Sequence, residues 1–93
     1  MRAGEERCEV YYSGWVQGVG FRYTARHLAG GHRVQGFVRN LSDGRVQLVV
    51  EGPPAEIDSF LAAIDQDMGR HIRDTAQSRA PATGEFRGFE VRR

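Results

Sequence analysis

Apolar residues in this chain switch between a period of two and a period of three to four, and this switching limits the possible folds more than any other feature. Residues 8–13 alternate apolar and polar side chains, which predicts a strand with one buried face. In residues 21–29 apolar side chains recur every three or four positions, which predicts a helix that the Gly30-Gly31 pair ends with a left-handed C-cap. The glycine-rich residues 14–20 between them are predicted to form a shaped loop.

The same switching continues through the second half of the chain. Residues 34–38 and 46–50 predict two strands of a hairpin, with a tight turn at residues 42–44. Residues 53–69 predict a second helix, because two prolines suit its first turn and one apolar stripe follows at helical spacing. The stripe consists of Ile57, Phe60, Leu61, Ile64 and Met68. Residues 71–79 alternate only weakly, and we expect a strand there.

The order strand, helix, strand, strand, helix, strand predicts a ferredoxin-like βαββαβ fold. This is an α+β sandwich in which two helices cover one face of an antiparallel sheet. We expect residues 8–93 to form this single domain and residues 1–7 to be a disordered tail. Residues 72–85 are poor in apolar side chains, so they form either a weak edge that lowers stability or an edge covered by residues 86–91.

Composition excludes several classes of function. Thirteen basic and twelve acidic residues give a net charge of +1, too little to hold a nucleic acid without a local patch. All the cations are arginines, so lysine chemistry is excluded. The only cysteine, Cys8, forms no internal disulfide, and no segment resembles a signal peptide or a membrane span. We therefore expect a cytoplasmic monomer that binds neither nucleic acid nor membrane. The histidines His27 and His32 lack the neighbours of a metal site.

The glycine loop that precedes the first helix is the candidate site. Residues 14–22 join a strand to a helix start, where backbone amides and the helix dipole favour an anion and Arg22 could bind the same anion. Glycine spacing alone leaves a simple chain reversal equally open. The loop lacks the Lys and Ser/Thr of a P-loop, and its spacing is not GxGxxG, so a nucleoside triphosphate is disfavoured.

Two motifs together resemble the acylphosphatase family. Residues 14–22 read GWVQGVGFR and are similar to the family signature G-x-V-Q-G-V-x-F-R. The second signature is matched with its spacing intact by Gly36, Phe37, Val38, Arg39, Asn40, Gly44, Val46 and Gly52. The resemblance implies hydrolysis of acyl phosphates to a carboxylate and inorganic phosphate, with no metal and no organic cofactor. Inorganic phosphate would be both the product and a competitive inhibitor.

The resemblance also implies which residues form the site. By similarity, the phosphate is held by the backbone amides of Gln17, Gly18, Val19, Gly20 and Phe21 together with the side chain of Arg22. Asn40 would orient the attacking water, and because its amide cannot accept a proton at neutral pH, a substrate phosphate oxygen would take that proton.

The alternative function is a non-catalytic module of the same fold that binds phosphate or carbamoyl phosphate. Such a module would resemble the N-terminal domain of hydrogenase-maturation carbamoyltransferases. Those proteins continue into zinc-binding cysteine pairs, whereas this sequence stops at Arg93. A free-standing enzyme is the favoured expectation.

Overall fold

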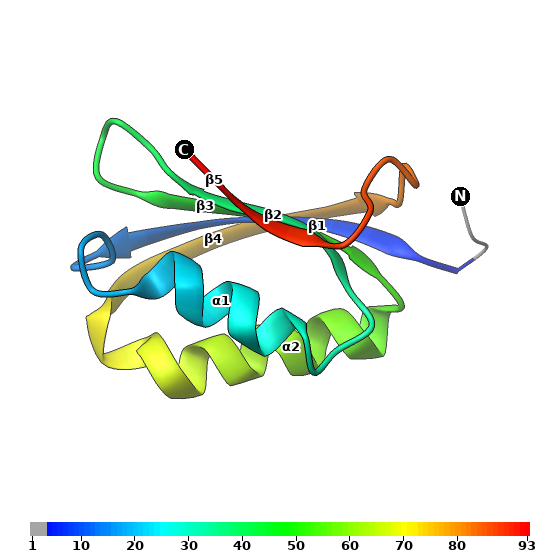
Figure 1. Cartoon of the computed structure of the whole chain (residues 1–93), viewed down its shortest axis with the longest axis horizontal. Coiled ribbons are helices and arrows are strands. Elements are labelled where there is room, and N and C mark those ends of the chain that lie inside the picture. Colours follow the sequence, from blue (N-terminus) through cyan, green and yellow to red (C-terminus); the bar gives the residue numbers. More distant parts are fainter. Residues whose placement is uncertain (1–3) are drawn as a thin grey trace.

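Two helices pack against one face of a five-stranded sheet in the computed structural model, which describes residues 4–93 (Figure 1). The elements follow one another along the chain as β1 (Glu6–Gly14), α1 (Phe21–Ala29), β2 (Gln35–Asn40), β3 (Val46–Gly52), α2 (Pro54–Met68), a 3₁₀ turn (Gly69–His71), β4 (Ile72–Pro81) and β5 (Phe89–Arg92). The ferredoxin-like fold predicted from the sequence is confirmed.

The strands lie side by side in the order β4-β1-β3-β2-β5. Three of the four pairings are antiparallel, but β5 runs parallel to β2. The prediction of a purely antiparallel sheet was therefore wrong. After β4 at one edge, residues 82–88 carry the chain to the opposite edge, where β5 adds a fifth strand. Its four residues are too few for their alternation to establish a strand from the sequence.

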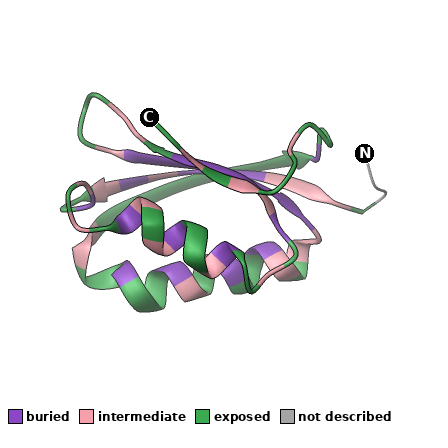
Figure 2. Cartoon of the chain, viewed as in Figure 1, coloured by how far each residue is buried: buried purple, intermediate pink, exposed green. Residues whose placement is uncertain are grey.

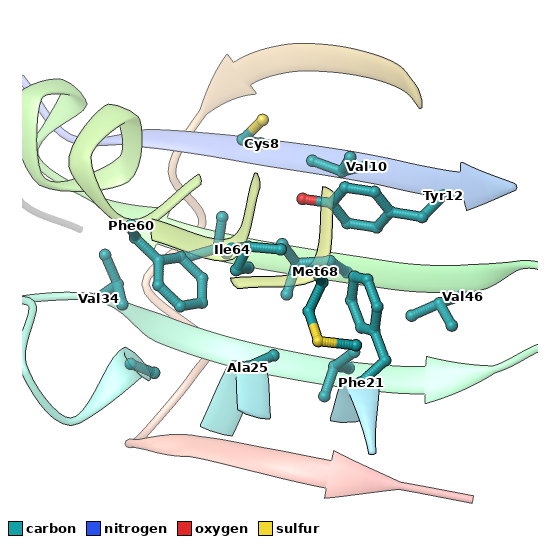
Figure 3. Close-up of a cluster of buried hydrophobic side chains, with 14 of the residues drawn as sticks. Cys8, Val10, Tyr12, Phe21, Ala25, Val34, Val46, Phe60, Ile64 and Met68 are labelled. Atoms are coloured by element: carbon teal, nitrogen blue, oxygen red, sulfur yellow. The ribbon is translucent and has the colours of Figure 1, made fainter. Parts of the chain in front are cut away.

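The hydrophobic core fills the layer between the sheet and the helices, as the burial pattern in Figure 2 shows. Figure 3 shows side chains from β1, α1, α2 and β3 gathered in this layer. Four members of the predicted α2 stripe are buried, and Leu61 packs against them from a partly buried position. Every residue of β3 is buried, and this strand lies at the centre of the sheet between β1 and β2.

The first strand begins at Glu6, two residues before the predicted domain start. Glu6 and Arg7 pair with Gly52 and Glu51 of β3, so they belong to the sheet. The rest of the predicted tail includes residues 1–3, which lie outside the described residues.

The end of α1 also differs from the prediction. The helix stops at Ala29 as expected, but Gly30 has a φ of −64° and stays right-handed. Its amide instead donates to the carbonyl of His27 at 3.2 Å, so a tightened last turn ends the helix without a left-handed cap.

Strand β4 occupies an exposed edge of the sheet. It pairs with β1 along its whole length, and apart from Ile72 its residues are exposed. The segment 86–91 lies at the other edge and does not cover β4, so that alternative was wrong. The exposure of β4 explains its poor apolar pattern, since it buries almost no side chain.

The connection between β4 and β5 is fastened to the outer face of the sheet by Glu51. The buried carboxylate accepts hydrogen bonds from the amide of Thr83 at 2.9 Å, its hydroxyl at 2.8 Å and the amide of Gly84 at 2.9 Å. Phe86 then meets Phe37 of β2 with ring centroids 5.8 Å apart. These contacts hold the loop that delivers β5 to its place beside β2.

Neither α1 nor α2 of the described chain combines the length and hydropathy that crossing a membrane requires.

Candidate active site

The loop between β1 and α1, residues 15–20, is here called the cradle loop, and its first residues are held in place. The amide of Trp15 donates to the carbonyl of His71 at 2.9 Å, which ties the loop to the start of β4. Val16 is fully buried in the core, whereas the Trp15 side chain is 77% exposed. The loop therefore leaves the sheet from a fixed point.

The side chain of Gln17 fastens the cradle loop to the β2–β3 hairpin. Its amide nitrogen donates to the carbonyls of Leu41 at 2.8 Å and Arg45 at 2.9 Å. Sequence reasoning assigned Gln17 only a backbone role. No sequence signal pairs a glutamine with carbonyls more than twenty residues away, so this function becomes visible only in the structure.

The backbone amides of the cradle loop lack acceptors. Within residues 4–93, no carbonyl or side chain accepts a hydrogen bond from the amides of Gln17, Gly18, Val19, Gly20 or Phe21. Gly18 and Gly20 have φ angles of 77° and 80°, which side-chain-bearing residues rarely adopt. Positive φ angles next to unpaired amides are typical of an anion-binding nest, in which successive amides turn toward one ligand.

The start of α1 adds positive potential at the same place. Gly20 is its N-cap and supplies no side-chain hydrogen bond, and the first helical turn contains no acidic residue. The amides of that turn and the positive end of the helix dipole are therefore not neutralised by the protein. An anion bound there would accept hydrogen bonds from these amides and interact favourably with the helix dipole.

A pocket of about 210 Å³ opens at this junction. It is lined by Val16, Gly18, Gly20, Phe21, Arg22, Tyr23 and Asn40. The fold thus brings Arg22 and Asn40, which the sequence proposed as catalytic, to one pocket from different elements. Gln17 and Val19 do not line it with their side chains: Gln17 faces the hairpin, and Val19 packs against the core. Sequence reasoning did not assign Tyr23 to the site.

Among the described residues, no carboxylate contacts the guanidinium of Arg22. Its Nη1 donates a long hydrogen bond of 3.4 Å to the carbonyl of Arg92 in β5. None of the ion pairs among residues 4–93 includes Arg22. The charge is therefore available to an anion in the pocket.

Asn40 ends β2 next to the hairpin turn and has an unusual environment. Its Oδ1 is shielded from solvent and accepts no hydrogen bond within the described chain. A buried acceptor without a partner costs about 1–3 kcal/mol, which the fold must offset elsewhere. Such a cost is typical of a side chain whose partner is a ligand or a bound water.

Two aromatic rings support the helix start beneath the pocket. Tyr12 of β1 and Phe21 of α1 are both fully buried, and their ring centroids lie 4.9 Å apart. Burial raises the pKa of Tyr12 well above its usual range, so the phenol stays neutral. Tyr12 is therefore a neutral core residue that packs against Phe21 at the start of α1.

Other reactive side chains lie outside the pocket. Cys8 is fully buried, and its thiol donates to the Gln77 side chain at 3.3 Å. Burial raises the pKa of Cys8, which opposes a nucleophilic role. His32 contacts the carbonyl of Leu28 at 2.9 Å and the hydroxyl of Ser59 at 3.3 Å.

Comparison with known proteins decides the family. The family model described as acylphosphatase matches residues 8–91. The chain belongs to the acylphosphatase family. An acylphosphatase of Rubrobacter xylanophilus is 41% identical over 88 residues, which cover 94% of this chain and 80% of that protein. The resemblance inferred from the two signatures is confirmed, and with it the activity of an acylphosphatase, a hydrolase of acyl phosphates.

Solved acylphosphatase structures share the fold. The acylphosphatase of Bacillus subtilis superposes with a TM-score of 0.85 at 27% identity, over 95% of this chain and 99% of that one. HypF of T. kodakarensis superposes with a TM-score of 0.80 at 28% identity, but the match covers only 12% of its chain. An acylphosphatase-like fold therefore occurs both as a small protein and within a much larger one.

Proposed function

We propose that this acylphosphatase cleaves acyl phosphates by holding the phosphate in the cradle loop, with Arg22 neutralising its charge and Asn40 positioning a water. The observation that carries the proposal is the run of unpaired amides at a pocket that both Arg22 and Asn40 line. These residues come from the β1–α1 loop, the first turn of α1 and the end of β2.

The cradle and Arg22 act mainly on charge. In the transition state of phosphoryl transfer, negative charge spreads over the three equatorial oxygens of the phosphoryl group. Main-chain donors held by the fold need no reorganisation when that charge develops, and a guanidinium adds two parallel N–H groups at fixed geometry. A carboxylate is already a good leaving group, so positioning and charge complementarity carry most of the rate.

Asn40 supplies the geometry of attack. Its Oδ1, which has no partner within residues 4–93, accepts a hydrogen bond from the water and aims the water oxygen at phosphorus. The new P–O bond forms as the bond between phosphorus and the acyl oxygen breaks, and the electron pair leaves with the carboxylate. Both water protons end on phosphate oxygens, so the acyl phosphate dianion and water give a carboxylate and dihydrogen phosphate.

The alternative expected from the sequence was a non-catalytic module, and HypF contains a similar fold as a small part of its chain. Such a module needs the cradle loop and Arg22, but it does not need a water-directing group. The unpartnered Oδ1 of Asn40 at the pocket is a cost that binding alone does not explain. This favours turnover.

The decisive experiment measures hydrolysis of benzoyl phosphate by the purified protein. We expect turnover that a chelator leaves unchanged and that inorganic phosphate inhibits competitively. Arg22→Ala should lower kcat/KM by about 10²- to 10³-fold, the typical cost of losing a transition-state charge partner. Arg33→Ala removes an exposed arginine beyond the other end of α1 and should retain full activity.

If the protein hydrolyses benzoyl phosphate no faster than buffer alone does, the proposed mechanism is wrong and the non-catalytic binding module is the better account. Loss of activity on chelation would overturn a mechanism without metal. The cytoplasmic location and the monomeric state stay predictions, the latter checked by sedimentation of the purified protein.

A further inference from the structure

A second hollow adjoins the phosphate pocket. It has a volume of about 510 Å³ and lies between the first two turns of α1 and strand β5. Arg22 and Tyr23 line both hollows, so the two are neighbours that share a wall. A group attached to a phosphate in the smaller pocket has the larger hollow as an adjacent space.

The wall of the second hollow is strongly basic. Three of its residues are arginines, namely Arg22, Arg26 and Arg93, and none of them forms an ion pair with an acidic side chain within residues 4–93. The single acidic side chain in the wall is Glu90, and its carboxylate is held by Arg92 at 2.6 Å. Its charge is therefore already neutralised by a residue of β5.

Arg22 and Arg26 are four positions apart on α1 and so lie on the same face of the helix. Two like charges at this spacing repel each other and destabilise a helix. Within residues 4–93 no carboxylate offsets either of these two charges, whereas Arg7, Arg45, Arg79 and Arg92 each have a carboxylate partner. The uncompensated pair on α1 is therefore suited to an anionic ligand that reaches beyond the phosphate.

We infer that this enzyme prefers acyl phosphates whose acyl group carries a second anionic group, and that Arg26 binds that group. The inference rests on the proposed function, since it places the phosphate between the cradle loop and Arg22. The acyl part then extends along α1 toward Arg26. Tyr23, which is 64% exposed and lines both hollows, packs against the acyl chain between the two charges.

The test compares two rigid substrates of nearly equal shape, 3-carboxybenzoyl phosphate and 3-carbamoylbenzoyl phosphate. They differ in one negative charge, and neither places its second group where it can attack the acyl carbonyl. We expect the wild-type enzyme to show a kcat/KM about three- to tenfold higher for the carboxylate, as for a solvent-accessible charge pair. The preference should shrink in high salt, which screens such pairs.

Arg26→Gln keeps the length of the side chain and removes its charge. In this variant we expect the ratio of the two kcat/KM values to fall to about one, because an uncharged side chain does not distinguish the two substrates by charge. Arg33→Gln makes the same change in net charge beyond the far end of α1 and should keep the wild-type ratio.

The outcomes separate the two proposals. Hydrolysis of both substrates with equal efficiency, or a preference that Arg26→Gln retains, overturns the inference and leaves the proposed function standing. Hydrolysis of neither substrate overturns the proposed function and, with it, this inference. Loss of the preference in Arg33→Gln as well would show a general charge effect and would likewise overturn the role of Arg26.

Discussion

The side-chain amide of Gln17 donates a 2.8 Å hydrogen bond to the carbonyl of Leu41 and thereby joins the cradle loop to the hairpin that follows Asn40. A second bond, to Arg45, spans the other side of the same turn. One side chain thus sets the distance between the amides proposed to bind phosphate and the residue proposed to direct the water. The relative position of the two halves of the site depends on this link.

Gln17→Leu should therefore weaken catalysis more than phosphate binding. Leucine has a similar size but cannot donate, so the carbonyls of Leu41 and Arg45 each lose one donor and keep only a backbone amide. We expect a loss of about 1–2 kcal/mol in the free energy of unfolding and a fall in kcat of about tenfold, as for a loosened reacting geometry. Gln66→Leu, at an exposed site on α2, is the control and should change neither. An unchanged kcat in Gln17→Leu would contradict this role.

Asn40→Ala should separate stability from activity. The substitution removes a buried acceptor that has no partner, so we expect the melting temperature to stay the same or rise. The affinity for inorganic phosphate should be preserved, while kcat should fall by about 10²- to 10³-fold. Calorimetric titration with phosphate, beside steady-state kinetics, makes the comparison. Full activity in this variant would exclude the water-directing role.

Gly20→Ala should damage the site through backbone conformation alone. No atom lies within 4 Å of a methyl group added at Gly20, so there is no clash, but its φ of 80° is strained for alanine. We expect a destabilisation of about 1–2 kcal/mol or a local change in the loop, with weaker phosphate binding either way. Gly20→Asn should be tolerated better, since asparagine visits this region.

The matched control is Gly69→Ala. A methyl group there also meets nothing within 4 Å, but Gly69 has a φ of −55° that alanine adopts easily. Stability should be unchanged or slightly higher. Equal losses of phosphate affinity in Gly20→Ala and Gly69→Ala would contradict the conformational argument.

Glu51 should make the fold sensitive to acid. Burial alone would raise the pKa of this carboxyl, but the hydrogen bonds from Thr83 and Gly84 together lower it below its usual value of 4.5. The carboxylate therefore contributes stability that is fully present above pH 4.5 and is lost as pH falls through the lowered pKa. Denaturant unfolding across this range measures the effect.

In Glu51→Gln the acid dependence should become shallower, because the titrating group is gone. The free energy of unfolding at neutral pH should fall by about 1–3 kcal/mol, since an amide cannot accept all of the existing bonds. Glu85→Gln removes another carboxylate that contacts Arg7, but one that is 56% exposed, and should cost little. A wild-type acid profile in Glu51→Gln would assign the acid sensitivity to other carboxylates.

Elements with strong periodicity could be predicted from the sequence, and those held by distant partners could not. The α2 stripe and the β2–β3 hairpin lie where their patterns place them, because one face of each packs on a continuous core. Strand β5 follows a loop whose path depends on Glu51, thirty-two residues earlier, and local periodicity contains no such information. Strand β4 is an edge strand that buries almost nothing, so its pattern was weak.

The same distinction applies to the site. Arg22 and the glycines stand in one contiguous motif, and that motif identified them. Asn40 entered through a second motif, and the structure brings it to the same pocket. The side-chain bonds of Gln17, and the second hollow with Arg26, depend on contacts across the fold. The former need the hairpin beside the cradle loop, and the latter needs β5 beside α1.

The amides that we propose to bind phosphate belong to the main chain, which affects how the family can diverge. Mutation replaces side chains but leaves every N–H in place, so a cradle of this kind tolerates drift as long as Gly18 and Gly20 preserve its path. Residues that face the neighbouring hollow have no such protection and can be exchanged singly. Natural selection could thus change which acyl phosphates are cleaved without altering the main-chain amides proposed to bind the phosphate.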